Sequence, residues 1–207
     1  MSETRQAALD AFLRLIGERG YAAVSLRDVA QAAGLGFAEF YAHFADKVAL
    51  AGAFMARIDA RVLEGVPSSG DPEETARDRL FDTMMRRYDA LQPYRPVLRT
   101  LRQAATRDPL LALALGPSLR RSMACMLEAA SLPADGLSGA LRQNGLLAIH
   151  FSVSGVFDDD DTPDLSKTMA ALDRRLKTTE NWVQVFEKYG KNSQRTERIQ
   201  TSDARDT

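Results

Sequence analysis

The sequence predicts an all-α protein. Apolar residues recur at three- and four-residue spacings through most of the 207 residues, and alternating β-branched residues nowhere run long enough to indicate a sheet. The prolines stand at the edges of the periodic segments. With 45% hydrophobic and 27% charged residues, the chain has the composition of an ordinary soluble globular protein that can bury a sizeable core.

Four helices are expected before the first long break in the apolar period. Their approximate ranges are 2–19, 25–33, 36–43 and 46–63. Gly20 is the expected stop of the first helix, Ser25 is the expected cap of the second, and Asp46 opens the fourth. Gly34 permits the positive φ of a sharp turn between the second and third helices, so these two are expected to form a compact pair.

The turn-rich stretch GVPSSGDP, residues 65–72, separates this part from a larger helical half. The helices expected there cover residues 73–91, 93–105, 108–115, 117–130, 136–157 and 163–189. Asp108 before Pro109, and Thr162 before Pro163, each have the form of a cap followed by proline at the first helical position. From Gly190 onward the chain is polar and lacks an apolar period.

The stretch SLRDVAQAAGLGFAEFYAHFADKVAL, which begins at Ser25, has the spacing of a helix, a tight turn and a second short helix. It resembles the N-terminal DNA-binding module of TetR-type transcriptional regulators. The matching residues are Ser25, Val29, Ala30, Ala33, Gly34, Tyr41, His43, Phe44, Lys47 and Leu50. The resemblance implies a helix-turn-helix domain over residues 1–47, a helical domain for effector binding and dimerisation over residues 48–189, and a polar tail over residues 190–207.

Nine residues are candidates for contact with double-stranded DNA: Ser25, Arg27, Gly36, Phe37, Ala38, Glu39, Tyr41, His43 and Lys47. The free amides after Ser25 can meet a phosphate, and the resemblance implies further backbone contacts by Tyr41, His43 and Lys47. The competing interpretations are core packing for Tyr41 and simple solvation for Lys47. Phe37 can contact a thymine methyl group, and Glu39 can accept from a cytosine amine.

Two observations weaken the DNA-binding interpretation. The recognition helix departs from the family pattern at Gly36, Phe37 and Ala38, where a small hydroxylated cap, a basic or polar residue and a glycine are usual. Through Leu50, six acidic residues outnumber five basic ones, and the whole chain has a formal net charge of −1. A DNA-binding domain normally presents a basic footprint, because neutralising phosphates supplies most of the non-specific affinity.

The larger half offers no catalytic constellation, so the protein is not expected to be an enzyme or to hold a metal or cofactor. Its only histidine is His150, and it shows no Ser/His/Asp order, metal-ligand spacing or glycine-rich phosphate loop. The acidic run FDDDDTPD, residues 157–164, lacks the spaced ligands of a calcium loop, and we interpret it as a solvated loop that caps the next helix. The single cysteine, Cys125, rules out an intrachain disulfide.

A small apolar effector is the expected ligand of this half. The candidate lining residues are Met84, Tyr88, Leu98, Leu101, Met123, Met126 and Leu127. Such a pattern more often marks ordinary core, which is the competing interpretation. Four arginines are candidates for an added anion contact: Arg86, Arg87, Arg95 and Arg99.

The last two expected helices match the pair that forms the dimer interface in TetR-type proteins, so a homodimer is expected. The candidate interface residues are Leu146, Ile149, Phe151, Leu172, Leu176 and Trp182. The alternative is that this stripe forms an intramolecular core.

A second, shorter resemblance supports a different function. The stretches TPDLSKTMAALDRRL and RLFDTMMRRYDAL are similar to lipid-binding ubiquinone-biosynthesis proteins that share the TetR-like fold without acting on DNA. The alternative function is therefore lipid or isoprenoid binding. No apolar run approaches the roughly 20 residues that span a bilayer, and no leader pattern precedes the first helix, so we expect a cytoplasmic protein without a membrane partner.

Overall fold

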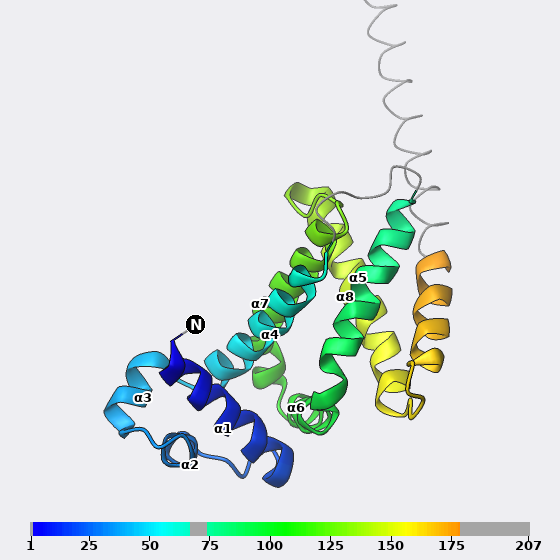
Figure 1. The fold of residues 1–207 in the computed structure, drawn as a ribbon. Coiled ribbons are helices and arrows are strands. Elements are labelled where there is room, and N and C mark those ends of the chain that lie inside the picture. Colours follow the sequence, from blue (N-terminus) through cyan, green and yellow to red (C-terminus); the bar gives the residue numbers. More distant parts are fainter. Residues whose placement is uncertain (1, 67–73, 179–207) are drawn as a thin grey trace, which may run out of the picture.

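The computed structural model describes residues 2–66 and 74–178, and every regular element in these ranges is a helix (Figure 1). The elements are α1 (Glu3–Arg19), α2 (Leu26–Ala32), α3 (Phe37–His43), α4 (Lys47–Glu64), α5 (Ala76–Leu91), the short 3₁₀ helix η1 (Gln92–Tyr94), α6 (Arg95–Arg107), α7 (Pro109–Ala129) and α8 (Gly136–Asp158). A further helix begins at residue 166 and is described through residue 178. The expectation of an all-α fold with an N-terminal helix-turn-helix module is confirmed.

The three N-terminal helices form a small module at one end of the molecule (Figure 1). Its centre is made by Phe12 and Ile16 of α1 together with Phe40 of α3 and Phe44 just after it, each no more than 1% exposed. Helix α1 also packs against α4 and α6. The module is therefore fixed to the rest of the chain through two helices of the larger part.

Helix α7 lies at the centre of the larger part and contacts α4, α5, α6 and α8. By length and composition it is the one helix among the described residues that could cross a membrane. It packs on four neighbours, yet only 22% of its apolar window is buried within the chain.

The sequence-based division of residues 108–130 into two helices at Pro117 is wrong, because α7 runs through Pro117 without a break. A proline inside a helix removes one hydrogen bond and costs about 3 kcal/mol. The residue whose carbonyl loses its helical partner is Leu113, which is 74% exposed and can be solvated. Contacts with four helices keep α7 continuous. The start of α7 was predicted well, since Asp108 accepts hydrogen bonds from the amides of Leu110 and Leu111.

The start of the last helix also differs from the prediction, because Pro163 lies in a turn and the helix begins three residues later. The predicted Thr162 does cap this helix, since its hydroxyl accepts from the amide of Ser166 at 3.0 Å, and the buried Asp160 accepts from the amide and the hydroxyl of Thr168 at 2.7 Å each. Burial by itself would raise the pKa of Asp160, but hydrogen bonds from Thr162 and Thr168 lower it below its usual range. The interpretation of the acidic run as a helix-capping loop is confirmed, although its capping carboxylate is not solvated.

Candidate DNA-contacting face and effector cavity

The turn between α2 and α3 has the geometry expected of a helix-turn-helix. Gly34 adopts a φ of 69°, and the amide of Leu35 closes the turn on the carbonyl of Ala30 at 3.0 Å. Because Phe40 is buried against the module's core, α3 turns its other side to solvent. This exposed side carries Ala38, Glu39, Tyr41 and Ala42.

The N-terminus of α2 is already capped by an acidic side chain. The Ser25 hydroxyl accepts from the amide of Asp28 at 3.1 Å, and the Asp28 carboxylate accepts from the amide of Ser25 at 2.8 Å and from its hydroxyl at 2.6 Å. These hydrogen bonds from Ser25 lower the pKa of Asp28, so this carboxylate is charged at neutral pH. A phosphate approaching the amides after Ser25 would meet a like charge, which sequence reasoning about Ser25 alone had missed.

The Phe37 side chain packs against its neighbours in the protein and does not project freely into solvent. Its ring is partly buried and stacks near Phe40 and Tyr41, with centroids 6.4 and 6.0 Å away. The guanidinium of Arg27 covers it at 4.6 Å. Arg27 is exposed, so it places a cation beside α3. The Phe37 ring is the surface against which its guanidinium packs.

Lys47 fastens the loop that joins α1 to α2. Its ammonium donates to the carbonyls of Tyr21 and Val24 at 2.8 and 2.9 Å and lies 4.2 Å from the Tyr21 ring. Burial lowers the pKa of this ammonium. An ammonium has three donors, so one remains for a phosphate. Lys47 therefore has a structural role that the sequence did not reveal.

Eight of the nine predicted DNA-contact residues lie on α2 or α3 or at their N-caps, and the ninth, Lys47, is the first residue of α4. The exposed ones are Ser25, Arg27, Gly36, Ala38, Glu39 and Tyr41, and the partly buried ones are Phe37, His43 and Lys47. The carbonyl of His43 accepts from Arg5, whose guanidinium lies 4.7 Å from the Phe44 ring. Arg5 is thus a further cation of this face that the sequence analysis did not single out.

Comparison with known families identifies this module. Residues 8–54 match the family described as "Bacterial regulatory proteins, tetR family". The N-terminal module is of the TetR type. The match covers the whole helix-turn-helix and the first part of α4, which are the elements that build the face described above.

Solved structures of TetR regulators share the fold over nearly their whole length. A TetR transcriptional regulator from Nitrosomonas europaea aligns with a TM-score of 0.68 and 22% identity, over 86% of this chain and 98% of that one. A TetR regulator from Rhodococcus sp. RHA1 aligns with a TM-score of 0.61 and 20% identity, over 84% and 94% of the two chains. No curated protein is significantly similar to the chain in sequence. At these identities the likeness establishes the TetR-type fold.

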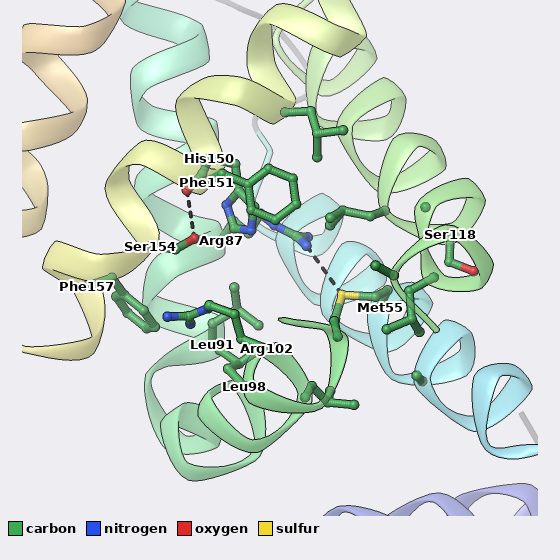
Figure 2. Close-up of a pocket in the computed structure, with 18 of the residues that line it drawn as sticks. Met55, Arg87, Leu91, Leu98, Arg102, Ser118, His150, Phe151, Ser154 and Phe157 are labelled. Atoms are coloured by element: carbon green, nitrogen blue, oxygen red, sulfur yellow. Dashed lines mark hydrogen bonds between the residues drawn. The ribbon is translucent and has the colours of Figure 1, made fainter. Parts of the chain in front are cut away.

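A cavity of about 580 Å³ lies in the larger part, among α4, α5, α6, α7 and α8 (Figure 2). Its lining residues are Ala51, Met55, Arg87, Tyr88, Leu91, Leu98, Leu101, Arg102, Ala105, Thr106, Ala112, Leu115, Gly116, Ser118, Leu119, Leu147, His150, Phe151, Ser154 and Phe157. Most of these are apolar, and the volume lies in the range of small-molecule sites. Thr106, Ala112 and Phe151 are exposed, so the cavity communicates with solvent beside them.

Three of the seven residues predicted to bind the effector, Tyr88, Leu98 and Leu101, line this cavity. The other four do not: Met84, Met123, Met126 and Leu127 are at most 2% exposed and belong to the packed core. Methionine content could not tell these positions apart, because adaptable side chains suit a filled core as well as a cavity wall. Of the four arginines considered, Arg87 is on the lining. The contribution of α8 to the cavity lining was not predicted, because a helix that is apolar on most sides does not indicate which side lines a cavity.

Two polar side chains of the cavity wall are the partly buried His150 and the fully buried Arg87. The Nδ1 atom of His150 lies 3.3 Å from the Tyr88 hydroxyl. Burial, with smaller contributions from Arg87 and Arg102, lowers the pKa of His150 to about 3, so the imidazole is neutral at physiological pH. The Arg87 guanidinium donates to Asp59 at 2.6 Å, and the Ser122 hydroxyl donates to the same carboxylate oxygen.

The predicted interface residues divide between the core and the surface. Leu146, Ile149, Leu172 and Leu176 are at most 7% exposed within the single chain, which is the intramolecular role that the sequence had left open. Phe151 is 56% exposed and borders the cavity, and Trp182 lies outside the described residues. The apolar and small residues that α8 does expose are Gly136, Leu137, Ser138, Leu141, Ala148, Phe151, Ser152, Gly155 and Val156.

Proposed function

We propose that the protein is a ligand-responsive transcriptional regulator that binds operator DNA as a homodimer through α2 and α3. The observation that carries this proposal is that the helices lining the cavity also hold the DNA-contacting module. Helix α4 contributes Met55 to the cavity and begins at Lys47, which binds the α1–α2 loop. Helix α6 contributes Leu98 and Leu101 to the cavity and contacts α1.

The contact between α6 and the module is specific. The Thr100 hydroxyl accepts from the amide of Tyr21 at 2.9 Å, at the point where α1 has ended. A β-carbon added to Gly17 would lie 3.5 Å from Val97, so the two helices meet closely. A ligand that displaces α6 would therefore move the end of α1 with it, because packed helices shift as rigid bodies.

In the proposed homodimer the exposed face of α8 meets its symmetry copy. Gly145 and Gly155 have open space where a β-carbon would be, so small residues on this helix leave room for a close approach. A DNA-competent dimer should place its two α3 helices about 34 to 36 Å apart, which is one turn of B-DNA.

The test is selection of bound sequences from a random duplex pool with purified protein at low salt. The proposal expects enrichment of an inverted repeat whose half-sites are about one helical turn apart. The control is the double variant Glu39→Ala/Tyr41→Phe, which changes the exposed side of α3 but not its buried side. A pool that shows no enrichment with the wild-type protein contradicts the regulator proposal.

The second candidate function is binding of a lipid or isoprenoid by a TetR-fold protein that no longer reads DNA. It is favoured by the exposed side of α3, which offers Ala38 and Ala42 and the acidic Glu39, and by the Asp28 carboxylate at the start of α2. This function predicts that apolar ligands bind the cavity while no duplex is enriched in the selection.

A further inference from the structure

Arg87 is the polar group of the cavity whose hydrogen bonding is least complete. Its side chain is 1% exposed. One terminal nitrogen donates to Asp59, the other reaches the sulfur of Met55 at 3.6 Å, and Nε has no partner. Figure 2 shows this guanidinium on the cavity wall, with its contact to Met55 dashed. A thioether sulfur is a weak acceptor, so a buried cation is left with one strong partner on one side.

The edge of the Arg87 guanidinium that lacks strong hydrogen-bond acceptors can bind a ligand through two donors at once. The Nε atom and the terminal nitrogen near Met55 are two parallel donors on one edge of the planar guanidinium. This edge matches the two oxygens of a carboxylate, which it binds in a bidentate manner. Asp59 binds the remaining nitrogen and is itself held by Ser122, so the pair does not need to break when a second carboxylate arrives.

The charges on the cavity wall favour an anion. Arg87 and Arg102 are both on the lining, whereas their partners Asp59 and Asp158 are not. His150 and Tyr88 face the same space as neutral groups, since burial lowers the pKa of the imidazole and raises that of the phenol. The groups that reach the cavity are therefore two cations, neutral donors and a largely apolar surface.

From this geometry we infer that the cavity binds an apolar carboxylic acid, whose carboxylate takes the Nε edge of Arg87 and whose hydrocarbon part lies against the leucines of α6 and α7. The inference rests on the proposed role of the cavity as the effector site and names the chemical class of that effector. Met55 gives up its contact with Arg87 when the carboxylate enters.

Calorimetric titration with three ligands of equal chain length tests this inference without DNA. Decanoate, 1-decanol and decylamine are compared below their aggregation thresholds near neutral pH. A hydrogen bond to a buried charge contributes about 1.5 to 3 kcal/mol, so decanoate should bind about 10- to 100-fold more tightly than decanol. Decylamine should bind most weakly. Equal affinity for decanoate and decanol overturns the inference.

Variants assign the preference to Arg87. Removing Arg87 alone would leave Asp59 buried and unpaired, so the test is the double variant Arg87→Met/Asp59→Asn, in which the amide still accepts from Ser122. It should bind decanol as the wild type does and lose the preference for decanoate. The matched control is Arg99→Gln, because Arg99 is an exposed arginine of α6 that does not line the cavity.

The control should keep the preference for decanoate, and a double variant that keeps it overturns the assignment to Arg87.

Failure of the proposed function is distinct from failure of this inference. A protein that prefers decanoate but enriches no duplex is a carboxylate-binding protein and not a regulator.

Discussion

The neutral, partly buried His150 should make the protein's stability depend on pH in a predictable way. The folded chain holds this imidazole with a pKa of about 3, against an ordinary value of 6.5 in the unfolded chain. Between these two values the unfolded state binds the extra proton, so the free energy of unfolding falls as pH falls. The slope is about 1.4 kcal/mol per pH unit, and the loss accumulated from about pH 7.5 to about pH 4.5 is about 2.7 kcal/mol.

Urea denaturation of the wild type and of His150→Asn, followed by circular dichroism across this range, isolates the effect. The asparagine keeps a polar group near Nδ1, where His150 meets the Tyr88 hydroxyl. All other ionisable groups are the same in the two proteins, so their contributions cancel in the difference. The wild type should lose about 2 to 3 kcal/mol more than the variant. Parallel losses in the two proteins would mean that His150 accepts its proton without unfolding, which would refute the burial argument.

Three further predictions concern the module, its attachment and the dimer. Lys47→Met should lower the free energy of unfolding by about 1 to 3 kcal/mol, because it removes two hydrogen bonds to the α1–α2 loop. Unchanged stability in denaturation, with a salt slope of DNA binding shallower by about 0.9, would assign Lys47 to phosphate instead. Thr100→Val should leave ligand affinity unchanged in calorimetry but weaken the effect of the ligand on DNA affinity, since Tyr21 loses its acceptor on α6; an undiminished effect would contradict that coupling. Gly155→Leu should fold normally, because nothing lies within 4 Å of an added β-carbon, and should give the mass of one chain in light scattering. A dimer that survives this change is not formed through the α8 face.

Local signals in the sequence predicted the N-terminal part of the fold well. The caps at Ser25 and Asp46 and the turn at Gly34 are where the residues placed them, because each depends on neighbours within a few positions. Pro117 misled the prediction, since the contacts that keep α7 continuous come from helices distant in sequence. Local chemistry fixes where most helices begin, while tertiary packing decides whether they continue.

The candidate sites were harder to predict, for the same reason. The positions of the DNA-contact residues were clear, but their partners were not. The sequence did not show that Lys47 would bind backbone carbonyls or that Arg27 would lie on Phe37. In the cavity, Tyr88 was predicted and His150 was not, although the two side chains meet. That pairing joins residues on α5 and α8, which no spacing in the sequence relates.

The measurement that tests the central proposal most directly is fluorescence anisotropy of the wild-type protein with its selected duplex at several salt concentrations, starting near 50 mM. We predict binding whose logarithmic affinity falls linearly with the logarithm of salt concentration, with a slope of about −0.9 for each phosphate neutralised. The sparse cations of this face, Arg5, Arg27 and Lys47, make that slope a shallow one for a DNA-binding dimer. No measurable affinity for any duplex near 50 mM salt would mean that the helix-turn-helix is inert, and the regulator proposal would be contradicted.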